Sequence, residues 1–173
     1  AILILTLAWT LKSMTDSLGA AEYVSGVVAN SAAGLQQLLP AIIFIVAAFL
    51  AFATGTSWGT FGILIPICIA VFPAAEPLRI ISISACMAGA VCGDHISPIS
   101  DTTIMASAGA ECKHVHHVSS QLPYALTVAT VSFITFLVAG FTQQLGIFGS
   151  AVVSWICGIS LLAGALYVLK KKF

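Results

Sequence analysis

The stretch that decides the fold of this chain is Gly93-Asp94-His95-Ile96-Ser97-Pro98-Ile99-Ser100-Asp101-Thr102-Thr103. It holds two of the six acidic side chains of the sequence, together with four hydroxyl groups and a proline. The segments on either side, Ile80–Val91 and Ile104–Ala110, are largely apolar. Polar groups are expensive to remove from water, so their concentration between apolar segments indicates a buried or cavity-lining site that handles a cation or a proton.

Composition places the chain in a lipid bilayer. Of its 173 residues 60% are apolar and only 7% are charged, whereas a soluble domain carries about 25% charged residues. The net charge is zero and the only basic run is Lys170–Lys172, so nucleic-acid binding has no electrostatic support. We therefore expect a multi-pass protein of the cell membrane with an all-α fold, a polytopic helical bundle.

The segment that carries the polar stretch is expected to be a re-entrant hairpin. Ile80–Cys92 is too short to cross the bilayer alone. If Lys170–Lys172 is cytoplasmic, two full-length spans bring Lys113 back to the cytoplasm, and Arg79 belongs there too. A segment that starts and ends on one side has entered the membrane and turned back. The two spans are Gln121–Gly140 and Gly146–Leu169.

A second polar stretch, Thr54–Thr60, separates two short apolar runs, Ala41–Ala53 and Phe61–Phe72. Half-length apolar segments around Gly, Ser and Thr are typical of a discontinuous transmembrane helix, whose unwound backbone is tolerated only where protein covers it or a cavity adjoins it. We expect this break to lie at the depth of the hairpin tip. Small residues recur every fourth position at Ala85, Gly89 and Gly93, which predicts close helix packing.

Asp94 and Asp101 are the residues that we expect to carry the chemistry. Sodium is a hard cation that prefers oxygen ligands, and the two polar stretches offer carboxylates, hydroxyls and carbonyls. Burial raises the pKa of a carboxyl group, and a second carboxylate raises it further. Competition between sodium and protons for such carboxylates is the minimal mechanism of an antiporter. The alternatives are that the two acids cap helices or form a structural pair, and that Thr54–Thr60 is an ordinary loop.

Four histidines complete the candidate groups. His95 is a candidate proton relay, since histidine titrates near neutral pH, with a structural role as the alternative. His114, His116 and His117 follow Cys112, but their spacing fits no standard zinc pattern. We predict no metal role for this cluster, and a pH-sensing role stays open.

Together the stretches Thr54–Thr60, Gly93–Thr103 and His117–Tyr124 resemble the NhaC-type sodium/proton antiporter family of the ion-transporter superfamily. The resemblance implies a transporter of two inverted repeats, of which residues 1–173 are the C-terminal repeat; the N-terminal repeat of the same chain would be its partner. The start inside an apolar run, Ala1–Leu11, also suggests a piece of a longer protein. A homodimer is compatible with the family, and no cofactor is expected beyond the transported sodium and protons.

The resemblance places the ion and proton site, residue by residue, at Asp94, Ser97, Ser100, Asp101, Thr102, Thr103, Thr54, Ser57 and Thr60, with sodium at Asp94 and Asp101. The expected function is exchange of sodium for protons. The alternative is a sodium- or proton-coupled exchanger of organic acids such as malate and lactate, although neither polar stretch contains Arg or Lys. A channel is a further class. An enzyme is not expected, because no activated serine or cysteine arrangement and no metal-ligand triad is recognisable.

Overall fold

The structure is a computed structural model and describes residues 10, 13–14, 17–19 and 33–172. Every element within residues 33–172 is helical, which confirms the all-α prediction for that part of the chain. The predicted helix end at Ala1–Leu11 lies outside the described residues, apart from Thr10. The elements are α3 (Ala33–Thr54), α4 (Ser57–Val71), α5 (Pro77–Ile96), α6 (Asp101–Gly109), α7 (His114–Phe141), the 3₁₀ turn η1 (Gln143–Leu145) and α8 (Gly146–Lys172).

Four of these helices, α3, α5, α7 and α8, are long and apolar enough to cross a bilayer. The spans predicted within α7 and α8 are confirmed as full-length helices. α3 and α5 have 22 and 20 residues, which corrects their expected half length. Both helices continue through polar residues, at Gln36 and Gln37 in α3 and at Asp94 in α5, because a polar side chain lowers helix propensity only slightly. An apolar run therefore understates the length of the helix that contains it.

The centre of the molecule is a tight parallel contact between α3 and α5. A Cβ on Gly89 would overlap with the carbonyl oxygen of Phe44, and a Cβ on Gly93 would overlap with that of Ala48. Four residues further along, the Ser97 hydroxyl donates a hydrogen bond of 2.8 Å to the Phe52 carbonyl. The predicted small-residue face of α5 is thus confirmed, and it brings the backbones of the two helices into contact.

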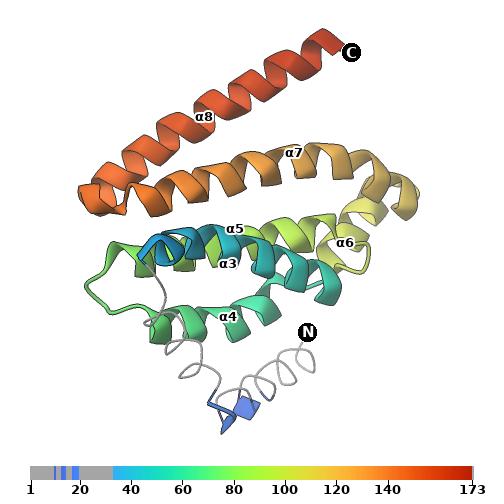
Figure 1. Cartoon of the computed structure of the whole chain (residues 1–173). Coiled ribbons are helices and arrows are strands. Elements are labelled where there is room, and N and C mark those ends of the chain that lie inside the picture. Colours follow the sequence, from blue (N-terminus) through green and yellow to red (C-terminus); the bar gives the residue numbers. More distant parts are fainter. Residues whose placement is uncertain (1–9, 11–12, 15–16, 20–32, 173) are drawn as a thin grey trace.

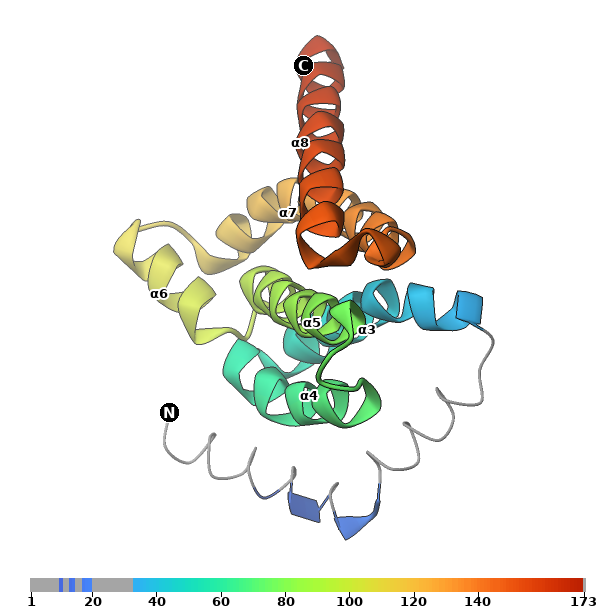
Figure 2. The ribbon, with the colours of Figure 1, turned by 90° about the vertical axis from the view of Figure 1, so that its left-hand side faces the viewer.

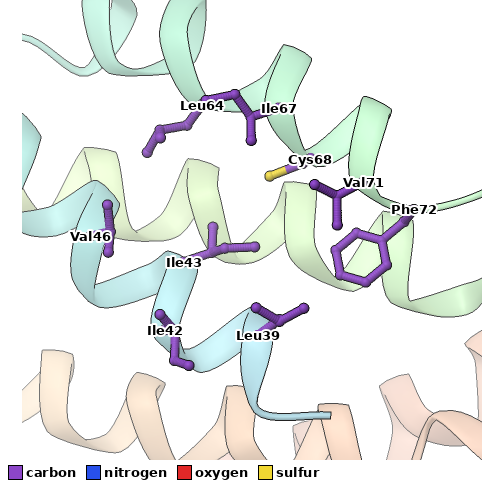
Figure 3. A pocket seen from close by; sticks show the side chains of 9 residues that line it. All are labelled: Leu39, Ile42, Ile43, Val46, Leu64, Ile67, Cys68, Val71 and Phe72. Carbon is purple, nitrogen blue, oxygen red and sulfur yellow. The ribbon is translucent and has the colours of Figure 1, made fainter. Parts of the chain in front are cut away.

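α4 turns back along α3 after the break at Gly55 and Thr56. Figure 3 shows the apolar side chains of the two helices facing one another across a small cavity of about 100 Å³, with Val46 near Leu64 at one end and Leu39 near Phe72 at the other. The predicted interruption is present, but α4 runs antiparallel to α3. This corrects the expectation that the two segments are halves of one helix.

The helices form layers, with α4 on one side of the α3–α5 pair and α7 on the other (Figure 1). α7 is antiparallel to α3, since Gly140 packs on the Gln37 carbonyl and the rings of Phe44 and Phe136 lie 5.6 Å apart. α8 is joined to α7 through η1. Next to this connection, the Ser150 hydroxyl of α8 donates a hydrogen bond to the Ala139 carbonyl of α7. The far end of α8 extends away from the other helices (Figure 2).

The chain does not return along α5 before α7 begins. α6 has nine residues, about 14 Å of helix. His114, the first residue of α7, contacts the carbonyl oxygen of Pro98, directly after α5. Arg79 lies in the first turn of α5, about 24 Å along the helix from His95. Arg79 and Lys113 therefore lie near opposite ends of α5, and the expectation that they share one side of the membrane stays a prediction.

Candidate functional site

Asp94 lies in the last turn of α5 and is only 7% exposed. Its carboxylate atom Oδ1 is fully buried and has no hydrogen-bond partner among the residues that the structure describes. The preceding residue, Gly93, packs against the backbone of α3, which holds this turn of α5 close to the neighbouring helix. A buried carboxyl oxygen without a donor is unfavourable, so this atom is suited to hold a proton or a cation.

Ser97 fastens the turn after α5 to the end of α3. The backbone N–H of Ser97 donates to the Asp94 carbonyl (3.1 Å), which ends the helix. Its buried hydroxyl donates to the Phe52 carbonyl and accepts a bond from the N–H of Ile99 (3.4 Å). This one side chain therefore links the turn after α5 to the end of α3, two residues before the Thr54–Thr60 stretch.

Gly55 makes the second link. Its φ of +68° belongs to the left-handed region, and a Cβ there would lie 2.9 Å from the carbonyl oxygen of Ile99. Glycine is the residue that adopts this conformation without strain. The expected proximity of Thr54–Thr60 to the turn between α5 and α6 is therefore confirmed.

The three remaining hydroxyls of the Gly93–Thr103 stretch form hydrogen bonds within this part of the chain. The hydroxyl oxygens of Ser100 and Thr102 lie 2.7 Å apart. The buried Thr103 hydroxyl donates to the His95 carbonyl (3.1 Å), a group that α5 leaves free at its end.

Asp101 differs from Asp94 in its surroundings. It is exposed and occupies the first turn of α6, where the helix macrodipole stabilises a negative charge. Asp94 is thus buried as expected, whereas Asp101 faces the outside of this part of the protein and fits the alternative of a helix-terminal acid.

The polar side chains around the α3–α4 break also form hydrogen bonds with the backbone of their own segments. The exposed Thr54 hydroxyl donates to the Leu50 carbonyl (2.8 Å), and the buried Thr60 hydroxyl donates to the Thr56 carbonyl (3.0 Å). Ser57, half-buried, is the first residue of α4, which is capped by the Thr56 side chain. A hydroxyl that has donated its hydrogen still has lone pairs, so these oxygens are chemically suited to bind a cation.

Two side chains of α7 that the sequence analysis did not assign to the site contact the end of α5 and the turn that follows it. The side-chain amide of Gln121 donates to the His95 carbonyl. The Nε2 atom of His114 lies 2.7 Å from the Pro98 carbonyl oxygen. The side chain of His95 is exposed and lines, with Gln121 and Tyr124, an open cavity of about 530 Å³ between α5 and α7. Sequence spacing contained no signal for these contacts, because each joins residues more than 15 positions apart.

Comparison with known proteins gives a consistent result. The family described as "Na+/H+ antiporter family" matches residues 1–141. The chain is 46% identical to an uncharacterized protein of Haemophilus influenzae over 99% of its length, which is 32% of that relative. It is 34% identical over 62% of its length to the malate-2H(+)/Na(+)-lactate antiporter of Bacillus subtilis, covering 24% of that protein.

A third relative is the arginine/ornithine antiporter of Halobacterium salinarum, 33% identical over 65% of the chain and 24% of that protein. The chain spans about a third or less of the length of these curated relatives. No solved structure matches it.

Proposed function

The chain belongs to the Na+/H+ antiporter family, and we propose that it forms part of a transporter that exchanges sodium for protons, with Asp94 holding the two ions in turn. The observation that carries this proposal is the buried Oδ1 atom of Asp94, which has no hydrogen-bond partner in the part of the chain that is described. Carboxylates within membrane proteins are functional by default, and this one is near a break between helices.

In the proposed cycle, the carboxyl group of Asp94 binds a proton and a sodium ion alternately. When Asp94 is protonated it is neutral, and its burial is tolerated. A sodium ion that reaches the site displaces the proton, because the carboxylate and nearby hydroxyl and carbonyl oxygens replace water around a hard cation. Release of sodium on the other side leaves the carboxylate unpaired, and a proton taken up there restores the starting state.

We assign sodium coordination to the residues of both polar stretches. Asp94 supplies the charge, and the neutral oxygens come from Ser97, Ser100, Thr102, Thr103, Thr54, Ser57 and Thr60. The support for this set is the link from Ser97 to Phe52 and the contact of Gly55 with Ile99. Asp101, exposed beside the turn, is proposed as a second cation ligand that attracts sodium to the site.

We also propose how the chain fits into a complete membrane protein. Residues 1–173 would form the C-terminal repeat of a multi-pass protein of the cell membrane, with its C-terminus in the cytoplasm and an N-terminal repeat as its partner. The chain covers only 32% and 24% of the length of two of its relatives, which supports a longer complete protein. Exposed apolar side chains such as Phe49, Phe148 and Trp155 would face lipid, the other repeat or a second copy.

The malate/lactate relative favours one alternative, an exchanger of organic acids coupled to sodium or protons. An organic anion requires a positively charged partner, and the two polar stretches contain no Arg or Lys. Addition of malate or lactate to the exchange assay separates the alternatives, since only the organic-acid exchanger responds with coupled movement of the anion.

The test is exchange by the complete transporter in liposomes. We expect Asp94→Asn to reduce sodium-driven proton movement at least about 100-fold, because the amide keeps the shape but not the charge of the carboxylate. Glu76→Gln is the matched control, since Glu76 is exposed at the opposite end of the same helix. Undiminished exchange by Asp94→Asn removes the proposed role.

A further inference from the structure

We propose that Gln121 of α7 is a positioning residue for the ion site, which holds the last turn of α5 and with it the carboxylate of Asp94. The side-chain amide of Gln121 donates a hydrogen bond to the backbone carbonyl of His95, the residue directly after Asp94. Gln121 is half-buried, and its bond joins a full-length helix to the end of α5. For transport, this role rests on the proposed function of Asp94.

The His95 carbonyl connects three helices. The buried Thr103 hydroxyl of α6 donates to the same oxygen at 3.1 Å, so this carbonyl accepts one hydrogen bond from α6 and one from α7. Its two lone pairs are then both used. Carbonyls in the last turn of a helix have no partner within the helix, and such a group is unfavourable inside a membrane. Gln121 and Thr103 therefore complete the end of α5.

The bond must come from the amide nitrogen of Gln121. A carbonyl oxygen only accepts a hydrogen, so the amide oxygen cannot face His95. An open cavity of about 530 Å³ adjoins this bond, and both residues line it together with Tyr124. Because the cavity lies between α5 and α7, the side chains of the two helices are not closely packed at this point. The Gln121 bond is consequently a direct connection from α7 to the turn that carries Asp94.

The position of the His95 carbonyl affects the Asp94 carboxylate, because consecutive residues of a helical turn move together. On its other side the turn is fixed by Gly93, where a Cβ would overlap with the Ala48 carbonyl oxygen of α3. Groups that bind an ion must be held within about 0.5 Å of the productive geometry. Loss of the Gln121 bond loosens the turn but keeps the negative charge, so we expect weaker sodium binding and continued exchange.

The direct test is the sodium dependence of exchange by the complete transporter in liposomes. Gln121→Met keeps the approximate length and shape of the side chain but removes the donor. We expect it to raise the sodium KM about fivefold, the effect of one hydrogen bond, with a nearly unchanged maximal rate. Gln144→Met is the matched control, since Gln144 is exposed in η1 beyond the far end of α7, and it keeps the natural KM. A natural KM in Gln121→Met overturns the positioning role, with or without a lower maximal rate.

A second variant keeps the test decisive if Gln121→Met does not fold. Gln121→Asn retains the amide but is one methylene group shorter, so its nitrogen falls short of the His95 carbonyl. We expect a higher sodium KM than in the natural protein here as well, because the donor is present but lacks reach. A natural KM in Gln121→Asn likewise overturns the role.

A double-mutant cycle tests the shared carbonyl without any transport measurement. Thr103→Val and Gln121→Met each leave one donor on the His95 carbonyl, whereas the double variant leaves none. We expect the double variant to lower the unfolding temperature in detergent by more than the two single losses together. The pair Thr103→Val and Gln144→Met is the additive control. Additive losses in the first pair overturn the shared carbonyl. Failure of the proposed function has a different signature, namely undiminished exchange in Asp94→Asn.

Discussion

Asp94 and Asp101 are seven residues apart in one polar stretch, yet their surroundings make them unequal. Asp94 is buried against α3, and Asp101 is exposed at the start of α6. Removing a charge from a buried site changes ion binding far more than removing one from the surface, where water screens it. The structure thus ranks two acids that the sequence alone presents as equivalent.

We predict that Asp101→Asn lowers the apparent affinity for sodium about two- to fivefold and leaves the maximal exchange rate nearly unchanged, since an exposed charge contributes about 1 kcal/mol or less. The sodium dependence of exchange in liposomes measures both quantities. Complete loss of exchange in Asp101→Asn would show that the complete transporter buries this acid as well.

Both the backbone conformation at position 55 and the close approach of Ile99 require a glycine there. We predict that Gly55→Ala destabilises the protein by about 2 kcal/mol, from the left-handed backbone and from the approach to Ile99. Gly146→Ala is the control, since Gly146 also has a positive φ but an added Cβ has no neighbour within 4 Å. Thermal unfolding in detergent compares the two, and an equal loss of stability would exclude the contact with Ile99 as a cause.

At the scale of the elements, the contact between α3 and α5 positions the site. We predict that Gly89→Ala and Gly93→Ala each destabilise the protein by about 1–3 kcal/mol, because the helices must separate to admit a methyl group. Gly62→Ala in α4 is the control, with open space around it, and is expected to be neutral or slightly stabilising. Equal unfolding temperatures for all three variants would contradict the packing.

The sequence predicted that one face of α5 packs closely against a helix, but it predicted neither which helix that is nor the course of the chain. The small residues of α5 recur at a helical period, so their face could be recognised locally. The antiparallel return of α4 depends on the conformation of Gly55, and the contacts of Gln121 and His114 join distant elements. Local patterns hold no information on such pairings. The prediction of burial succeeded for Asp94, inside a helix interface, and failed for Asp101, at a helix start.

At the scale of the whole molecule, α5 separates its two ends by the thickness of a bilayer core, since its 20 residues span about 30 Å. The re-entrant hairpin stays a prediction, and it requires these ends to lie on one side. We expect cysteines introduced at the exposed positions Ala75 and Ala110, in a variant without native cysteines, to react with impermeant reagents from opposite sides of the membrane. Labelling from one side would instead support the hairpin.

The central claim is that sodium and protons compete for Asp94, and sodium binding to the purified complete transporter tests it most directly. Calorimetry in buffers of different ionisation enthalpy counts the protons released when sodium binds. We expect proton release and a sodium affinity that rises with pH in the natural protein, and neither in Asp94→Asn. Sodium binding with unchanged proton release in Asp94→Asn would contradict the claim.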